Sequence, residues 1–437
     1  MAYVAVTGGQ KAIEQADLLT QYYRLKDSNA PIAVNAIEKQ LRLLVDRIMS
    51  EGGLYAPEHA AVALKQAEGD PSEAAFLIRA YRSTLPRNHY SQVIEPAGMR
   101  IIRRISSSFR DIPGGQLLGP TYDYTHRMLK FSLRGEDERA IEEFVDTYLR
   151  DADPEAQSVA NDRAVEKPAG ENNHEASELL RENNPAAGET NRENDRAALE
   201  STQENGPQTG APLTFVKVAD LLREQGLMGR TERKEIEPYD ITREKLTFPA
   251  PRSARLQTLT RGETGAMTAL AYSSMRGYGA VHPTIGELRV GYAPVYVPYP
   301  GGDGGADDDA LYIGEVMLTE VESINSFTQN QAGKIEFLLG YGLCFGQNEL
   351  KAIAMSILER SLETTGPAPA QDEEFVLLHI DSVESNGFVS HLKLPHYITF
   401  QSSLDRIRDT QARTAQPKEE QKKEAAPDET QLQPARV

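Results

Sequence analysis

Residues 151–213 are the feature of this sequence that most limits how the chain can fold. The segment holds 14 Asp and Glu against 5 Lys and Arg, and no Phe, Trp or Tyr stands between Tyr148 and Phe215. So few apolar side chains cannot offset the entropy that is lost when a backbone becomes ordered. The segment is therefore predicted to be a disordered acidic insertion, and His174 inside it is expected to have no function.

The composition of the remaining chain excludes several classes of protein. Half of the formal net charge of −18 lies in the insertion, so charge gives no support to nonspecific nucleic-acid binding. There is no 18-residue apolar run, and the first residues lack the basic start and apolar core of a signal peptide. The single cysteine, Cys344, excludes an internal disulfide framework and fits a reducing compartment. We expect a soluble cytoplasmic protein.

The apolar periodicity indicates an α+β fold in which a helical N-terminal domain precedes a mixed α/β region. Residues 1–95 are expected to be helical, and residues 96–150 to form a Gly-rich loop and a helix that belong to the core. After the insertion at 151–213, residues 214–411 are expected to form a mixed C-terminal domain, and residues 412–437 a disordered tail.

Local signals place several elements within these regions. One helix is expected to begin with Asn35 as its N-cap and to stop at Gly52, and another to begin after Asp70. The stretch YDYTHRMLKFSL, residues 122–133, is expected to be helical. The last third should contain strands and, after one of them, a helix capped near Asn348.

The segment RRISSSFRDIPGGQLLGP is a first candidate site. Gly114 and Gly115 would let backbone amides approach an anion, and Arg103, Arg104 and Arg110 could hold phosphates. The spacing does not match a Walker A motif, because no Gly-Lys-Ser/Thr follows the glycines. A purely structural Gly-Gly turn is the alternative.

Asp123 and His126 are a candidate acid–base pair in the expected helix. Residues three apart lie on one helix face, and a carboxylate beside an imidazole suits general acid catalysis. The alternative is that His126 simply packs.

Two further segments carry charged candidates. Arg276 lies in the Gly-rich exit of a helix and could pair with a phosphate, although a helix C-cap explains it equally well. Asp372, Glu373 and Glu374 could bind Mg²⁺ or could begin a helix, whose dipole favours acidic residues there. His379 falls within an apolar run and is expected to be a core residue.

The stretch HLKLPH contains a histidine pair, His391 and His396. On a regular strand the two rings would point to opposite faces, about 16 Å apart, so they can share an ion only if the segment bends, most plausibly at Pro395. Two histidines are half of a zinc site, so the other ligands would have to be carboxylates, water or residues of another chain. Two surface histidines beside an edge-strand proline are the alternative.

Seven long motifs follow one another along the chain in this order: YVAVTGGQKAI, VDRIMSEGG, DIPGGQLLGPTYDYTHR, LAYSSMRGYG, GYGLCFG, PAQDEEFVL and GFVSHLKLPHY. With these motifs the chain resembles the PhnI family, subunit I of the bacterial carbon–phosphorus lyase core complex, over nearly its whole length. The acidic insertion is its main departure from the family.

The resemblance implies a catalytic subunit. With partner subunits, such proteins displace adenine from MgATP with a phosphonate such as methylphosphonate, giving α-D-ribose 1-methylphosphonate 5-triphosphate, and alone they resemble a purine nucleosidase. It implies as partners subunits G, H and J of the core complex and the ATPase-like subunits K and L. It also implies Mg²⁺ with the ATP, and zinc at the interface with subunit J, which uses S-adenosylmethionine and an iron–sulfur cluster.

Together these considerations predict a set of site residues. The predicted metal ligands are His391 and His396, the predicted catalytic residues are Asp123 and His126, and the predicted substrate-binding residues are Arg110, Gly114, Gly115, Gln116 and Arg276. Two alternatives remain: a free-standing nucleoside triphosphate hydrolase, and a noncatalytic scaffold that contributes zinc ligands at a subunit interface.

Overall fold

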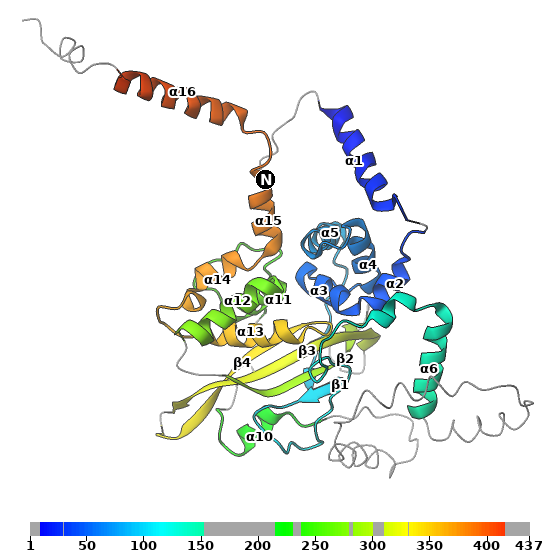
Figure 1. Ribbon diagram of the computed structural model, residues 1–437. Helices are drawn as coiled ribbons and strands as arrows, with labels where there is room; N and C mark the ends of the chain where they lie inside the picture. The colour runs from blue at the N-terminus through cyan, green and yellow to red at the C-terminus, as the bar shows by residue number, and fades with distance from the viewer. Residues whose placement is uncertain are drawn as a thin grey trace, which may run out of the picture. The chain divides into compact units, whose positions relative to one another are not determined.

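The chain contains two compact units, one of residues 1–110 with 214–437 and the other of residues 111–213. The computed structural model describes residues 9–28, 30–152, 215–229, 237–278, 283–299, 310–330 and 332–415. Within these ranges the expected α+β class is confirmed, because helices accompany one antiparallel sheet (Figure 1). Most of the predicted disordered insertion at 151–213, from residue 153 on and with His174, lies outside the described residues, as does most of the predicted tail at 412–437, from residue 416 on. Residues 412–415, which the prediction places in the tail, instead belong to the end of a helix.

The sheet of the first unit has the strand order β1-β2-β3-β4, and all neighbouring strands are antiparallel. Its strands are β1 (Arg100–Ile105), β2 (Thr284–Pro298), β3 (Ala310–Gln329) and β4 (Ile335–Phe345). Residues 286–291 of β2 are buried without alternation, which requires that both faces of the sheet be covered there. The strands predicted from the sequence are thus confirmed.

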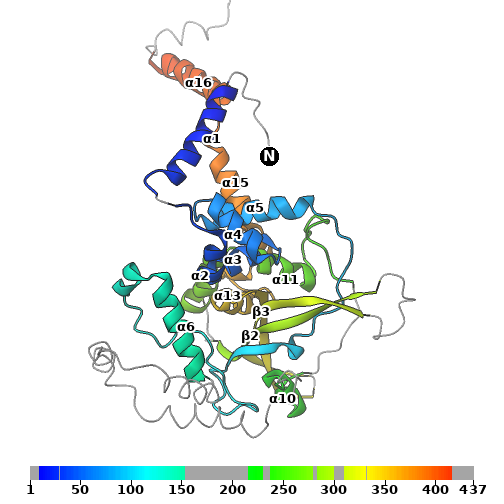
Figure 2. The ribbon, with the colours of Figure 1, turned by 90° about the vertical axis from the view of Figure 1, so that its right-hand side faces the viewer.

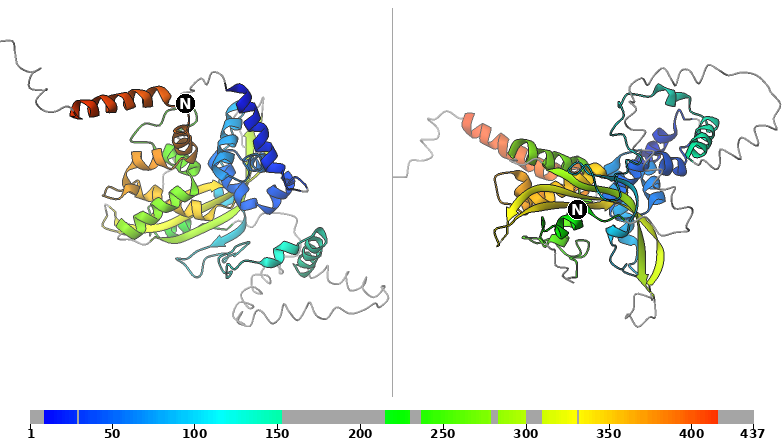
Figure 3. Two further views of the ribbon diagram at one scale, coloured as in Figure 1. Left: turned by 45° about the horizontal axis from the view of Figure 1, so that its top comes forward. Right: turned by 90° about the horizontal axis from the view of Figure 1, so that it is seen from below.

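Helix α13 (Glu349–Ser361) packs against β4 and β3. Its other side contacts α11 (Arg252–Arg261) and α12 (Thr264–Ser273), and a core cluster joins these helices to α14 (Glu373–His379). Figure 3 gives two further views of the sheet and these helices. Asn348 stands at the N-cap of α13 as predicted, but its side-chain amide donates to the carbonyl oxygen of Phe345 and does not cap the helix.

The N-terminal helices form a core of their own around Ile48 and Met49. They are α2 (Val34–Gln40), α3 (Arg42–Gly52), α4 (Pro57–Gln66) and α5 (Pro71–Thr84). Asp70 caps α5 as predicted, since its carboxylate accepts from the backbone N–H groups of Ser72 and Glu73 at 2.8 and 3.2 Å.

The prediction of one helix capped by Asn35 is wrong. Helix α2 begins at Val34 after Ala33, no side chain caps it, and the backbone leaves the helical conformation at Leu41. The break lets Ile37 of the first piece and Ile48 of the second enter the same core cluster. The end of the second piece follows the prediction, because Gly53 takes the left-handed conformation (φ 68°) that glycine adopts without penalty.

The prediction of a helix over residues 122–133 is also wrong. Residues 121–130 form turns and extended chain, and only Phe131–Gly135 (η2) is a short 3₁₀ helix. Two local features oppose a helix: Arg127 has a φ of 52°, and the hydroxyl oxygen of Thr121 accepts from the N–H of Asp123.

The remaining described elements are short or peripheral. They are α1 (Gln10–Leu25), η1 (Pro96–Gly98), α6 (Glu138–Ala152), α10 (Val218–Glu224), η3 (Ser274–Tyr278), η5 (Pro369–Gln371), α15 (Ser382–His391) and α16 (Tyr397–Ala415). Helix α15 lies beside α5 (Figure 2). No helix of the described part is both long and apolar enough to span a membrane.

Candidate functional site

His391 and His396 lie on either side of a turn between α15 and α16, so the edge-strand alternative is wrong. The N–H of Leu394 donates to the carbonyl oxygen of His391 at 2.9 Å and closes the turn. The two ring centroids are 5.5 Å apart, with an angle of 58° between the ring planes. The segment therefore bends enough to bring the imidazoles together.

The hydrogen bonds of the two rings suit them for binding a metal. Nδ1 of His391 contacts the carbonyl oxygen of Phe388, and Nδ1 of His396 lies 2.6 Å from that of Leu394. A carbonyl can only accept, so in the neutral imidazole each Nδ1 carries the proton and each Nε2 has a lone pair that can bind a metal. With Zn–N bonds of about 2 Å, two imidazoles on one tetrahedral zinc have centroids about 5 Å apart. The observed separation fits that geometry.

The pair is nevertheless an incomplete site. Among the described residues, no group of three or more His, Cys, Asp and Glu side chains could hold a metal ion. Large apolar side chains beside the pair are exposed, namely Phe388, Val389, Leu392, Tyr397 and Ile398. A half-site inside an exposed apolar surface is the arrangement expected where a second protein supplies the missing ligands.

Helix α15, which ends at His391, is fixed at its other end. Asp381 caps it by accepting from the N–H of Val383 at 3.0 Å. Its two carboxylate oxygens also accept hydrogen bonds of 2.7 and 2.6 Å from one guanidinium nitrogen of Arg79 in α5. Both side chains are largely buried, so this ion pair holds the start of α15 against the N-terminal helices.

The glycine loop of the second unit is exposed. Gly114 and Gly115 have φ values of 82° and 73°, and Gly115 N–H donates to the carbonyl oxygen of Ile112 at 2.8 Å. Since a Cβ on Gly115 would meet nothing within 4 Å, it is the backbone conformation that favours glycine there. Gln116, the next residue, is exposed as well.

Asp123 and His126 do not share a helix face, because the helix expected there is absent. Both side chains are exposed in the second unit, and Asp123 lies 3.8 Å from the guanidinium of Arg127. Asp123 and His126 still lie on the same loop, but the structure supports no closer pairing of the two side chains than their nearness in the chain.

The arginines divide into two groups. Arg103 and Arg104 are fully buried and paired with Glu349 and Glu287 at 3.0 and 2.6 Å, so the prediction that they hold phosphates is wrong. A guanidinium is costly to bury unless a carboxylate pairs with it, and each of these two arginines has such a partner. Arg110 and Arg276 are exposed; Arg110 ends the first segment of the first unit, and Arg276 lies in η3, a turn of π-helix after α12.

The acidic trio begins a helix. Asp372 is the N-cap of α14 and accepts from the N–H of Phe375, while Glu373 and Glu374 occupy the first turn. The prediction that His379 is a core residue is wrong, because it is exposed at the end of α14 with Nδ1 2.6 Å from the carbonyl oxygen of Phe375.

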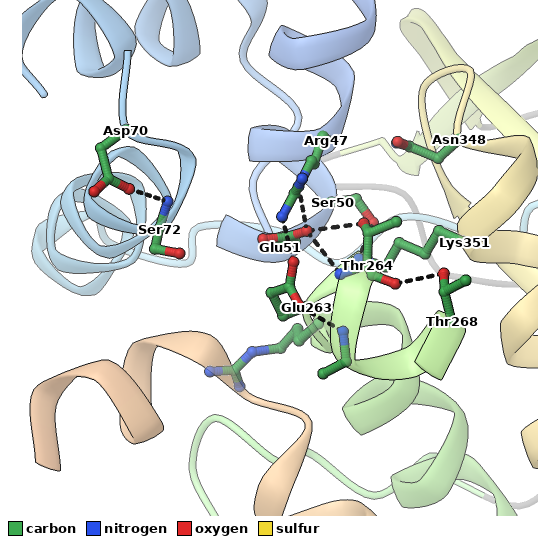
Figure 4. Close-up of polar contacts among 12 residues, drawn as sticks. Arg47, Ser50, Glu51, Asp70, Ser72, Glu263, Thr264, Thr268, Asn348 and Lys351 are labelled. Atoms are coloured by element: carbon green, nitrogen blue, oxygen red, sulfur yellow. Dashed lines mark hydrogen bonds and ion pairs between the residues drawn. The ribbon is translucent and has the colours of Figure 1, made fainter. Parts of the chain in front are cut away.

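Sequence reasoning missed a buried polar network, drawn in Figure 4, at the junction of the N-terminal helices and α12. One carboxylate oxygen of Glu51, which is fully buried, accepts from Arg47 at 2.8 Å and from the backbone N–H and hydroxyl of Thr264 at 3.1 and 2.9 Å. Arg47 also contacts Glu263, the N-cap of α12. The signal in the sequence is a set of three charged residues, Asp46, Arg47 and Glu51, within the helical stretch VDRIMSEGG.

Lys351, also fully buried, adds a titratable group to this network. Its ammonium donates to the Ser50 hydroxyl at 2.9 Å, and Ser50 donates to the carbonyl oxygen of Thr260 at 3.1 Å. Burial lowers the pKa of Lys351 from 10.5 to about 8, although Glu51 partly opposes the shift.

This shift predicts how stability depends on pH. Between pH 8 and 10.5 the folded protein binds fewer protons at Lys351 than the unfolded chain, so this contribution to the free energy of unfolding rises with pH. Below pH 8 the penalty of burying the charge is fully present. The free energy of unfolding of the wild type minus that of Lys351→Met should therefore rise by up to about 1.4 kcal/mol per pH unit in that window.

Urea denaturation from pH 7.5 to 10 measures this difference. Lys39→Met, at an exposed lysine of α2, is the matched control and should give no such slope. A flat difference for Lys351→Met would mean that folding does not lower the pKa of Lys351.

A second buried cluster secures the chain where it returns from residues 111–213. Glu320 pairs with Arg289 and, at 2.9 Å, with Lys217, and the Tyr341 hydroxyl donates to it at 3.1 Å. Burial opposes ionisation of Glu320, but Arg289 and Lys217 outweigh it and lower its pKa. Beside this cluster, Glu287 accepts from the backbone N–H of Val218 at 3.0 Å. The cluster is therefore structural, fixing the start of α10.

Fold and site together define an α+β protein with an exposed two-histidine half-site and an exposed glycine loop. A model of the family described as bacterial phosphonate metabolism protein (PhnI) matches residues 2–414. The chain belongs to the PhnI family.

Relatives match over nearly their full length. The chain is 45% identical to HtxH of Stutzerimonas stutzeri over 96% of this chain and 99% of that protein. It is 42% identical to the α-D-ribose 1-methylphosphonate 5-triphosphate synthase subunit PhnI of Escherichia coli strain K12, over 94% of this chain and 98% of that protein. It is 38% identical to the subunit of the same name from Rhizobium meliloti strain 1021, over 93% and 94%.

Proposed function

We propose that the chain is a subunit of a cytoplasmic carbon–phosphorus lyase system and that, with partner subunits, it displaces adenine from MgATP with a phosphonate. The product with methylphosphonate is α-D-ribose 1-methylphosphonate 5-triphosphate. The observation that carries the proposal is the nearly end-to-end similarity to two relatives named as subunits of the synthase that makes this compound. HtxH is likewise named as a C-P lyase subunit.

The reaction sets clear chemical requirements. Breaking the N-glycosidic bond builds positive oxocarbenium character on the ribose, so a general acid must protonate the departing purine while the phosphonate is held on the opposite face. The triphosphate needs cations, from Mg²⁺ and guanidinium groups. Without a phosphonate, water in the same position would make the protein a nucleosidase for ATP or GTP.

We assign these roles to exposed residues. Arg110, Arg276 and the loop of Gly114, Gly115 and Gln116 bind phosphate groups, and Asp123 or His126 acts at the base or ribose. The exposure of all of them and the left-handed backbone of the two glycines, which can present N–H groups to an anion, support this assignment.

The histidine pair is assigned to zinc. His391 and His396 would hold the ion through Nε2, and the J subunit would supply the remaining ligands. A zinc ion held in this way would link the two subunits and could act as a Lewis acid toward a substrate oxygen.

The partners proposed are subunits G, H and J and the ATPase-like subunits K and L. Exposed apolar side chains support several protein contacts: α6 carries a row at helical spacing, and α16 begins with three. These side chains are Ile141, Phe144, Val145, Tyr148 and Leu149 of α6, and Tyr397, Ile398 and Phe400 of α16.

The catalytic assignment is tested in the assembled complex. Asp123→Asn and His126→Ala should each lower formation of the ribose phosphonate at least tenfold if the residue transfers a proton. Adenine release by chromatography and the product by ³¹P NMR give the rates. Glu58→Gln, at an exposed carboxylate of α4, is the control and should keep wild-type rates.

A noncatalytic scaffold is the second candidate, and the exposed apolar rows on α6 and α16 favour it. In that case Asp123→Asn and His126→Ala would leave the rate of the complex unchanged. A free-standing hydrolase would instead release adenine rapidly from ATP without partners, with no change of product when phosphonate is added.

A further inference from the structure

A cavity of about 220 Å³ lies in the first unit beside η3. Its walls come from η3, from β3 and the C-terminal end of α13, and from the segment leading into η5. None of the residues assigned above lines it, although Arg276 lies in the same turn of π-helix. Turns of π-helix within α-helices are frequently found at functional sites.

The charge of the cavity is unbalanced. Among the described residues, Arg360 is the charged residue of the lining, and no carboxylate of this part of the chain lines the cavity. Nε of Arg360 is buried without a hydrogen-bond partner, and no ion pair joins this guanidinium to another side chain of the described part. A partly buried cation that lacks a counter-charge is costly, and a bound anion would remove that cost.

The hydroxyl groups of the lining are of two kinds. Ser326, on β3, makes no side-chain hydrogen bond within the described residues, so its proton is available to a ligand. Ser274, on η3, donates to the Ser361 hydroxyl at 3.2 Å, because the Ser361 proton is given to the carbonyl oxygen of Ile357. Arg360 and Ser326 thus offer donors from two different elements, α13 and β3.

The other polar side chains hold the wall in place. Ser361 donates to the carbonyl oxygen of Ile357 at 2.9 Å, and the Gln371 amide donates to Thr364 at 2.9 Å while accepting from the N–H of Ala368 at 3.1 Å. These bonds are satisfied without a ligand. They fix the shape of the cavity before anything binds, which lowers the entropic cost of binding.

We propose that this cavity binds a small molecule with a phosphoryl or phosphonyl group. The oxyanion pairs with the Arg360 guanidinium and accepts from Ser326, and the rest of the ligand lies against Met275 and Pro283. The planar guanidinium can engage two oxygens and the Ser326 hydroxyl a third, and a tetrahedral phosphoryl or phosphonyl group has a third oxygen where a carboxylate has none. The proposal rests on the charge and donors of this cavity and is independent of the proposed reaction.

Calorimetric titration of the purified full-length chain tests the proposal with methylphosphonate, ribose 5-phosphate, inorganic phosphate and acetate. At least one phosphorus oxyanion should bind with a submillimolar Kd, and acetate at least tenfold more weakly. Arg360→Gln should weaken the binding at least tenfold, and Arg408→Gln, at an exposed arginine of α16, should leave it unchanged.

Three results would overturn the proposal: no binding of any phosphorus oxyanion, equal binding of acetate, or wild-type binding by Arg360→Gln. If Arg360→Gln does not fold, Ser326→Val decides instead, because it fills part of the cavity and removes a donor while keeping the guanidinium. Because no turnover is measured, the outcome is separate from that of the catalytic test above.

Discussion

Alanine at His391 or at His396 is expected to remove zinc from the assembled complex almost completely. The described part of the chain brings only these two ligands together, so each variant leaves a single imidazole on this side of the ion. The effect should exceed the 10- to 100-fold loss of affinity that changes around a ligand cause, since here a ligand itself is removed. Zinc per complex, measured by elemental analysis after gel filtration, is the readout.

His379→Ala is a closely matched control for this experiment. His379 also ends a helix, is exposed, and has its Nδ1 against the carbonyl oxygen four residues earlier, but no second histidine stands beside it. It should retain full zinc content. Unchanged zinc in both His391→Ala and His396→Ala would disprove the assignment, as would a complete coordination sphere in the isolated wild-type chain.

The histidine pair shows how far local sequence can lead. The spacing alone showed that the two rings could share an ion only if the segment bends. The assignment to zinc came from the family resemblance and stays a prediction. The bend itself is a helix–turn–helix and not a kinked strand, because Asp381 caps α15 and Arg79, 302 residues away, holds that cap. Such a distant partner cannot be read from the segment.

The same limit explains the arginines and the buried network. Arg104 and its partner Glu287 are 183 residues apart, and Lys351 and Ser50 are 301 apart. A charged residue in a strand or helix is ordinarily taken as exposed, and only the fold reveals its counter-charge. Signals that act over a few residues, such as the Asp70 cap or the glycine at a helix end, were predicted correctly.

The substitution Gly340→Ala is expected to destabilise the protein strongly, although it adds only one methyl group. A Cβ at Gly340 would lie 1.9 Å from the carbonyl oxygen of Ser356, and one at Gly342 would lie 2.1 Å from that of Ala352. Both oxygens belong to the backbone of α13, so relief requires moving the whole helix away from β4. We expect a loss of about 3 kcal/mol or more in the free energy of unfolding for either variant.

The apparent midpoint of thermal unfolding should accordingly fall by about 5 °C or more in Gly340→Ala, since a unit of this size has a large entropy of unfolding. Gly387→Ala is the matched control, because Gly387 lies within α15 and its Cβ would meet nothing within 4 Å. Alanine there should raise stability by up to about 1 kcal/mol, as in an exposed helix. Equal midpoints for Gly340→Ala and wild type would show that α13 does not rest on β4 through these two glycines, and the glycines of the GYGLCFG motif would then need another explanation.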